Sequence, residues 1–194
     1  HGAFWFIQPE LATDKHKFTE NLSTLERELQ RSKDEFIKEH CVKYGKEGYP
    51  PAWKILELVS FGSLTTLYFN FADTTIKKKI ARSYGVPQHE MLESWMKAVN
   101  ALRNACAHHE RIWNRVMPVI PQLPATLRNT WITDKPQMAN RFYAVFCCLI
   151  YWLNAIEPEN TLVQDFKSLL QEFPNVDTTA MGFTTNWKED PFWL

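Results

Sequence analysis

Apolar side chains at helical spacing run along most of this chain, and they restrict its fold more than any other sequence feature. Over residues 14–40 acidic and basic residues are mixed nearly evenly, and a series of apolar residues contains Phe18, Leu22, Leu25, Leu29 and Phe36. These five lie on one stripe, because an α-helix makes a turn every 3.6 residues. Similar patterns recur downstream. The sequence therefore predicts an all-α helical bundle of about five to six helices with an irregular aromatic C-terminal tail.

Glycine and proline separate the predicted helices. A helix over residues 53–71 follows the break at residues 45–51, and a short basic helix ends at the Gly-Val-Pro sequence of residues 85–87. We predict a long central helix over residues 88–115. Gly is scarce, with six in the chain, and no glycine-rich phosphate-binding motif occurs.

The C-terminal part begins with a proline-rich connector, which is predicted to be non-helical. Two further helices are expected over residues 137–156 and from residue 160 to just before Pro174. The tail is expected to pack back on the bundle through its aromatic residues, which include Phe183, Trp187, Phe192 and Trp193. At 194 residues the chain has the length of a single domain, and we predict one over residues 1–194.

Cysteine and apolar content indicate a cytoplasmic protein without a membrane span. The four cysteines lie in apolar stretches without C-x-x-C spacing, which favours buried reduced thiols over a zinc site or a disulfide. The longest apolar run, residues 142–153, has twelve residues, too few to cross a bilayer, and predicts a buried core helix. No signal peptide is visible. The chain begins with His1, so we expect a fragment or a processed form.

Charge is distributed unevenly, although the chain carries 22 basic and 22 acidic residues. Residues 41–115 carry eleven Lys and Arg against six Asp and Glu, whereas residues 156–194 carry two against seven. The neutral total argues against a general nucleic-acid binder, but the basic middle can still meet phosphates.

The central helix is predicted to carry two different stripes. The apolar one has spacings of four and three and contains Trp95, Val99, Leu102, Cys106, His109 and Trp113. His109 is therefore expected in the core. The polar one contains Asn104, His108, Arg111 and Arg115, with Arg103 on its flank. Asn104 can hydrogen-bond one ring nitrogen of His108 and leave the other for proton transfer. Without further context, such a face is more often a solvated surface.

Residues 103–108, Arg-Asn-Ala-Cys-Ala-His, resemble the R-N-x-x-x-H motif of the HEPN superfamily, which contains many metal-independent ribonucleases. The surroundings are also similar to the bacterial abortive-infection Abi family (AbiD/AbiF-like): Pro-Pro-Ala-Trp at 50–53, Trp95, His-x-Arg-x-Trp-Asn-Arg at 109–115 and Met-Gly-Phe at 181–183. Family members usually have a further N-terminal helical region, which we expect this chain to lack.

The resemblance implies an all-helical HEPN domain that cleaves RNA without metal or cofactor, with Arg103 and His108 as the catalytic pair and Asn104 in support. Such ribonucleases bring two motifs together, so the resemblance implies a homodimer or an RNA-assembled complex. We expect RNA phosphates to contact the basic and amide residues Lys77, Lys78, Lys79, Arg82, Arg111, Asn114 and Arg115. Two alternatives stay open: a module that holds a structured RNA or a partner without cutting it, and the toxin of a toxin–antitoxin pair.

Overall fold

The structure, a computed structural model, describes residues 1–45 and 48–194 of the chain. These residues form eight α-helices and six short 3-10 helices, and none of them belongs to a β-strand. The all-α prediction is confirmed. The chain divides into two compact units, His1–Lys77 and Lys78–Leu194. A single domain over residues 1–194 stays a prediction.

The first unit is built around helix α1, which packs against α4. Its helices are α1 (Lys15–Arg31), α2 (Glu35–Tyr44), α3 (Ala52–Ile55), α4 (Phe61–Asn70) and the first turn of α5 (Thr74–Ser83). The 3-10 helices η1 (Trp5–Ile7), η2 (Pro9–Leu11) and η3 (Leu56–Leu58) complete it. The core of this unit is apolar and consists of Phe6, Leu25, Ala52, Ile55 and Leu67.

A pair of side chains joins the start of α1 to the end of α4. The Asp14 carboxylate accepts hydrogen bonds from the N–H groups of His16 and Lys17 and so caps α1. The buried amide of Asn70 accepts from the Asp14 N–H at 2.8 Å and donates to the Asp14 carbonyl at 2.8 Å. Asn70 is 56 residues further along the chain. Its side chain thus satisfies the hydrogen-bonding groups of the Asp14 backbone, which lies just before the first turn of α1.

Two predicted helices of this unit are each interrupted. The segment over residues 14–40 forms α1 and α2, because Ser32 and Asp34 adopt extended backbone conformations. The Ser32 hydroxyl donates to the Asp34 carboxylate and accepts from the Asp34 N–H, and such local bonds compete with a continuous helix. The segment over residues 53–71 is likewise split, since Ser60 is extended and caps a new helix through the Ser63 N–H.

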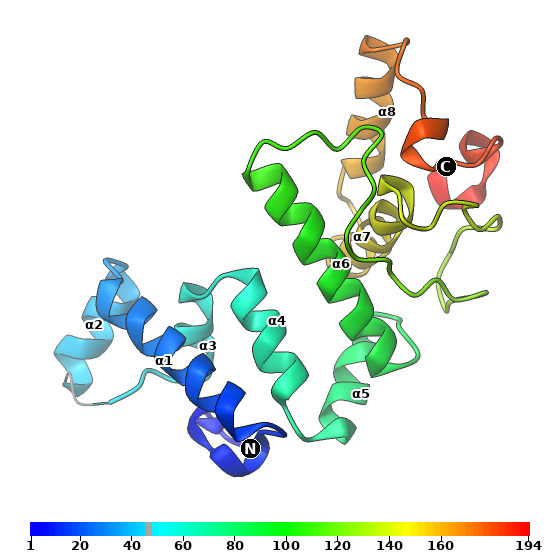
Figure 1. The fold of residues 1–194 in the computed structure, drawn as a ribbon. Coiled ribbons are helices and arrows are strands. Elements are labelled where there is room, and N and C mark those ends of the chain that lie inside the picture. Colours follow the sequence, from blue (N-terminus) through cyan, green and yellow to red (C-terminus); the bar gives the residue numbers. More distant parts are fainter. Residues whose placement is uncertain (46–47) are drawn as a thin grey trace. The chain divides into compact units, whose positions relative to one another are not determined.

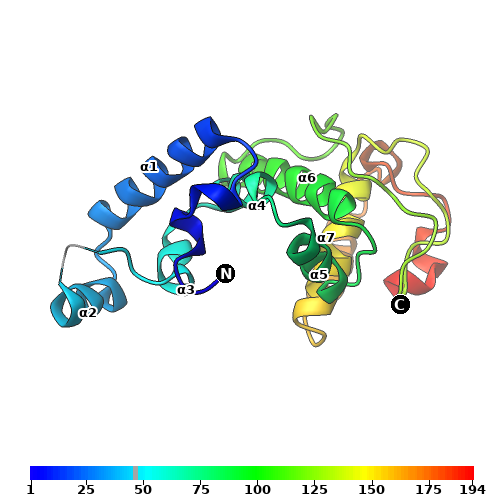
Figure 2. The same ribbon diagram turned by 90° about the horizontal axis from the view of Figure 1, so that it is seen from below.

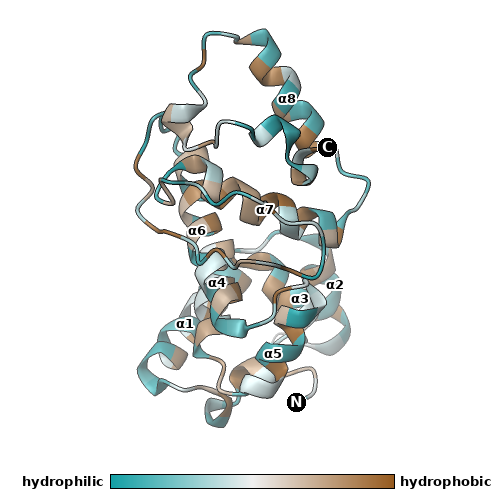
Figure 3. Cartoon of the chain, turned by 90° about the vertical axis from the view of Figure 1, so that its right-hand side faces the viewer, coloured by the Kyte–Doolittle hydropathy of each residue, from teal (hydrophilic) through white to brown (hydrophobic). Residues whose placement is uncertain are grey.

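The second unit contains the rest of α5 together with α6 (His89–Ala107), α7 (Phe142–Ile156) and α8 (Leu162–Glu172). Helices α6 and α7 pack against each other and lie side by side in both views (Figures 1 and 2). Hydrophobic colour covers most of α7, as its twelve-residue apolar run predicts (Figure 3). Trp95 of α6 stacks on Trp131 at 5.5 Å between ring centroids. The predicted buried core helix is confirmed.

The C-terminal tail packs on this core as predicted. It forms three 3-10 helices, η4 (Thr179–Met181), η5 (Trp187–Glu189) and η6 (Pro191–Trp193). Phe183 stacks on Phe166 of α8 at 5.5 Å, and the Trp193 ring is fully buried beside Tyr143 of α7. Asp190 fixes the last turn, because its carboxylate accepts from the Thr133 N–H and hydroxyl and from the Phe192 N–H.

The predicted bounds of α7 and the predicted burial of the thiols need correction. Helix α7 begins at Phe142 rather than near residue 137, because Asn140 uses its carbonyl to accept from Met117 and Arg141 is extended. Burial is confirmed for two of the four cysteines, Cys147 and Cys148. Cys41 is half-buried and Cys106 is exposed.

Candidate functional site

Helix α6 ends at Ala107, eight residues before the predicted end of the central helix. His108 caps it, with its N–H donating to the Asn104 carbonyl at 3.0 Å. His109 has a φ of +53°, a left-handed conformation in which histidine is enriched among non-glycine residues. The Glu110 N–H then reaches back to the Ala105 carbonyl at 2.9 Å. This pattern is a Schellman motif, which ends a helix.

Tertiary contacts hold the chain away from a helical path after His109. The Trp113 indole donates to the Asp177 carbonyl at 3.2 Å, and the buried Met117 donates its N–H to Asn140 at 2.8 Å. Asn114 has a φ of +51°, and its side-chain oxygen accepts from Arg141 at 3.1 Å. These bonds join segments far apart in the sequence and take the place of further helical turns.

The exposed end of α6 brings together the three residues of the motif. The side chains of Arg103 and His108 are exposed, and that of Asn104 is half-buried. Leu102 and Ala105, on the opposite side of the same turn, are buried. Because the last helical hydrogen bond joins His108 to Asn104, these two residues lie one turn apart, as their spacing predicts.

One predicted contact of the motif is replaced by another. Asn104 was expected to fix the tautomer of His108 through its side chain. In the structure, the Asn104 side-chain oxygen accepts from Arg103 Nη1 at 3.1 Å. The amide therefore orients the guanidinium, which keeps further N–H donors for other acceptors.

The predicted apolar stripe is wrong at its C-terminal end. His109 is exposed, because the helix has ended before it and the left-handed residue redirects the chain. Cys106 is exposed as well, and Ala105 continues the buried stripe instead. Trp113 is 41% exposed, and its indole nitrogen donates to the Asp177 carbonyl. The end of α6 thus exposes two adjacent imidazoles, whereas the spacing of the stripes predicts one.

The basic run on α5 divides between core and surface. Lys77 is only 5% exposed, and its ammonium donates to the Phe69 carbonyl at 2.9 Å. It precedes the fully buried Ala81 by one helical turn and so shares the inward face of α5. The proposed contact of Lys77 with phosphate is therefore corrected. The remaining members of the run, Lys78, Lys79 and Arg82, are exposed.

The residues after α6 that were predicted to contact RNA have different surroundings. Arg111 is exposed. The Arg115 guanidinium forms an ion pair with Glu110, which offsets its charge. The Asn114 amide oxygen is engaged by Arg141. The helix that periodicity predicts over residues 109–115 gives no sign of the pairing with Glu110 and Arg141.

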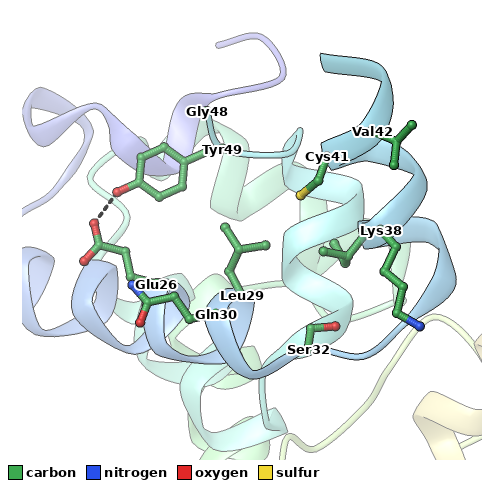
Figure 4. Close-up of a pocket in the computed structure, with 10 residues that line it drawn as sticks. Glu26, Leu29, Gln30, Ser32, Lys38, Cys41, Val42, Gly48 and Tyr49 are labelled. Atoms are coloured by element: carbon green, nitrogen blue, oxygen red, sulfur yellow. Dashed lines mark hydrogen bonds between the residues drawn. The ribbon is translucent and has the colours of Figure 1, made fainter. Parts of the chain in front are cut away.

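A separate cavity of about 860 Å³ lies in the first unit, lined by residues of α1, α2 and the segment before α3 (Figure 4). Tyr49 donates a hydrogen bond to Glu26 at one side of it, and desolvation together with this carboxylate raises the tyrosine pKa to about 12. Its lysine, Lys38, is 3.4 Å from Glu35. The cavity contains none of the motif residues.

The described residues show neither a metal cluster nor a membrane-spanning helix. No group of three or more His, Cys, Asp or Glu residues within 1–45 and 48–194 is arranged to hold a metal ion. In the same part of the chain, no helix combines the length and the apolar character that a membrane crossing needs.

The exposed turn of α6 combines groups that can perform proton transfer next to a phosphate. An imidazole can accept and return a proton near neutral pH. A guanidinium one turn away can stabilise negative charge as it develops on phosphate oxygens. These are the groups needed to cleave a phosphodiester that carries its own neighbouring hydroxyl nucleophile.

Comparison with known proteins gave one result. A family model described as Abi-like protein matches residues 2–114. The match includes the whole of α6 and the turn that carries Arg103, Asn104 and His108, and it ends at Asn114. The searches of curated proteins and of solved structures each gave no match.

Proposed function

Because the chain belongs to the Abi-like protein family, whose role is abortive infection, we propose that it defends a bacterial cell by cleaving RNA in the cytoplasm as a metal-independent HEPN-type endoribonuclease. The observation that carries the proposal is the exposed turn at the end of α6, where Arg103, Asn104 and His108 meet. Each of these residue types has a role in phosphodiester transfer, and the side chains of Arg103 and His108 are exposed.

The proposed reaction uses the 2′-hydroxyl of the RNA as nucleophile. His108 takes the proton of that hydroxyl, and the 2′-oxygen forms a bond to the adjacent phosphorus. Arg103, oriented by Asn104, stabilises the charge on the non-bridging oxygens. The bond from phosphorus to the 5′-oxygen then breaks, and this oxygen takes a proton from an imidazolium. The products are a 2′,3′-cyclic phosphate and a 5′-hydroxyl.

The acid that protonates the 5′-oxygen has two possible sources. We propose, as the resemblance implies, that a homodimer supplies His108 of a second protomer. The exposure of His109 adds a source within the same chain. His109→Asn separates them. Full cleavage by this variant assigns the acid to His108 of the second protomer, and a mixture of Arg103→Ala chains with His108→Ala chains then stays inactive, because a dimer of one chain of each kind holds a single His108. Loss of cleavage in His109→Asn places both imidazoles in one chain.

The experiment that tests the proposal is RNA cleavage in the presence of EDTA. Purified protein is incubated with total RNA and compared with His108→Ala. We expect the wild type to cut and the variant to be inactive. His16→Asn is the matched control, since it also removes one exposed imidazole but lies on α1, outside the motif. RNA that is retained by both proteins and cut by neither favours the alternative function, a non-catalytic RNA-binding module.

A further inference from the structure

A cleft of about 300 Å³ in the second unit lies between the end of α5 and the loop that precedes α7. Its lining comes from two segments, Arg82 with residues 85–87 and residues 126–128. Val86, Pro87 and Leu127 form apolar walls, while the side chains of Arg82 and Arg128 are exposed to solvent. The described lining thus has two guanidinium groups and no carboxylate.

The cleft is built on a fixed support rather than on loose loops. Gly85 ends α5 with a φ of +71°, and the Val86 N–H donates back to the Ala81 carbonyl at 3.0 Å. Tyr151 of α7 joins the two walls, because its hydroxyl donates to the Gly85 carbonyl at 3.1 Å and accepts from the Asn129 N–H at 3.4 Å. Burial raises the pKa of Tyr151, so the hydroxyl keeps its proton at neutral pH.

We infer that this cleft binds one nucleotide of a single-stranded RNA, with the base against the apolar walls and the adjacent phosphates on Arg82 and Arg128. The inference rests on the proposed function and adds a substrate-binding site to it. The volume suits one nucleotide, since ligand pockets begin at about 300 Å³. Bases pack on apolar surfaces and on guanidinium planes, and two cations in one small cleft call for an anionic ligand.

The position of the cleft sets a minimum length for the bound RNA strand. Residues 85–87 of its lining directly precede α6. The catalytic turn lies at the other end of this helix, which Figure 1 shows in full. Nineteen residues at about 1.5 Å each separate the two by about 28 Å. The bound nucleotide is therefore not the one that is cleaved, and a strand must be several nucleotides long to reach both places. We expect the RNA to be single-stranded, because a base in the cleft is unpaired.

The test measures binding, not cleavage, so that its outcome is independent of the proposed catalysis. All proteins carry His108→Ala to keep the RNA intact, and binding of a fluorescent ten-nucleotide RNA is followed by anisotropy at several salt concentrations. Arg128→Ala is expected to weaken binding about tenfold. It should also reduce the slope of log affinity against log salt by about 0.7, the value for one phosphate contact on a single strand.

One further variant tests the apolar wall of the cleft, and another is a control outside it. Leu127→Ala is expected to weaken binding with the salt slope unchanged, since it removes apolar contact and no charge. Lys135→Ala is the matched control, because it removes one exposed positive charge outside the cleft and should change affinity less than twofold. Circular dichroism of each variant checks that it is folded.

The outcomes separate the possible ligands. Adenosine monophosphate is measured beside the RNA, and much weaker binding of this free nucleotide supports a strand-binding site. Equal affinity for both overturns the assignment to a strand. Equal affinity of Arg128→Ala and the Lys135→Ala control for the RNA overturns the cleft as a site. If Arg128→Ala weakens binding but the wild type never cuts RNA, the cleft stands and the proposed catalysis fails.

Discussion

Substitution of Gly85 by alanine tests the support that Tyr151 gives to the second unit. A Cβ atom added at Gly85 would lie 2.5 Å from the Tyr151 hydroxyl oxygen and 3.2 Å from the ring carbon that bears it. The φ of +71° costs an alanine about 1–2 kcal/mol. Overpacking against the hydroxyl adds about 1–3 kcal/mol, and the smaller entropy of the unfolded chain returns about 0.4–1 kcal/mol. We predict that Gly85→Ala lowers the free energy of unfolding by about 2–4 kcal/mol.

A double-mutant cycle with Tyr151→Phe isolates the steric part. Tyr151→Phe alone removes the bonds to Gly85 and Asn129 and costs about 1–3 kcal/mol. It also removes the oxygen that the new Cβ would meet at 2.5 Å, so the cost of Gly85→Ala in this background falls toward its backbone part, about 1 kcal/mol once the smaller entropy of the unfolded chain is included. Urea unfolding followed by circular dichroism measures all four proteins. Costs that add within about 0.5 kcal/mol would refute the predicted contact between these residues.

Three further predictions concern other parts of the fold. Trp193→Ala should lower the free energy of unfolding by about 3–5 kcal/mol, because this fully buried ring leaves a large cavity, and urea unfolding against a Trp193→Phe control measures it. Ellman's reagent should label Cys106 at once in the native protein but label the buried thiols only after unfolding, since burial raises the pKa of Cys147 and Cys148. Hydrogen bonding to the Lys17 N–H lowers the pKa of Asp14, so its contribution is present at neutral pH and is lost as the pH falls through that lowered value. Asp14→Asn should therefore weaken the acid dependence of unfolding, measured between pH 6 and 2.

Elements with a strong apolar pattern could be predicted from the sequence. The run at residues 142–153 gives a helix that is buried on nearly every side, and its twelve apolar residues are more than a typical strand contains. The packing of the tail could be predicted because several aromatic rings lie close together in its sequence, and burying rings such as Trp187 and Phe192 removes a large apolar area from water. In both cases the sequence signal is a group of apolar side chains whose burial stabilises the fold.

Helix ends depended on interactions that periodicity does not contain. The stripe of the central helix continues through His109 and Trp113, yet the helix stops at Ala107. The bond from Trp113 to Asp177 spans 64 residues of sequence and could not be foreseen. His109 was consequently assigned to the core although it is exposed.

The candidate site was predicted where it depends on local spacing and missed where it depends on tertiary structure. Asn104 and His108 are four residues apart within or next to a helix, so their proximity follows from the sequence. Lys77 lies beside Lys78 in a basic run, and only packing shows that one is buried and the other exposed. Arg128 is a single basic residue in a loop, without periodicity or motif, and only the folded chain brings it to the cleft of Arg82.

The central claim is that the turn carrying His108 cleaves RNA through the 2′-hydroxyl of the substrate itself. The most direct measurement compares one RNA oligonucleotide with the same sequence made as DNA, in EDTA, and identifies the product ends by mass spectrometry. The account predicts that the wild type cuts only the RNA, leaves 2′,3′-cyclic phosphate and 5′-hydroxyl ends, and loses this activity in His108→Ala but not in Lys135→Ala. Cleavage of the DNA strand, 5′-phosphate ends, or full activity of His108→Ala would contradict it.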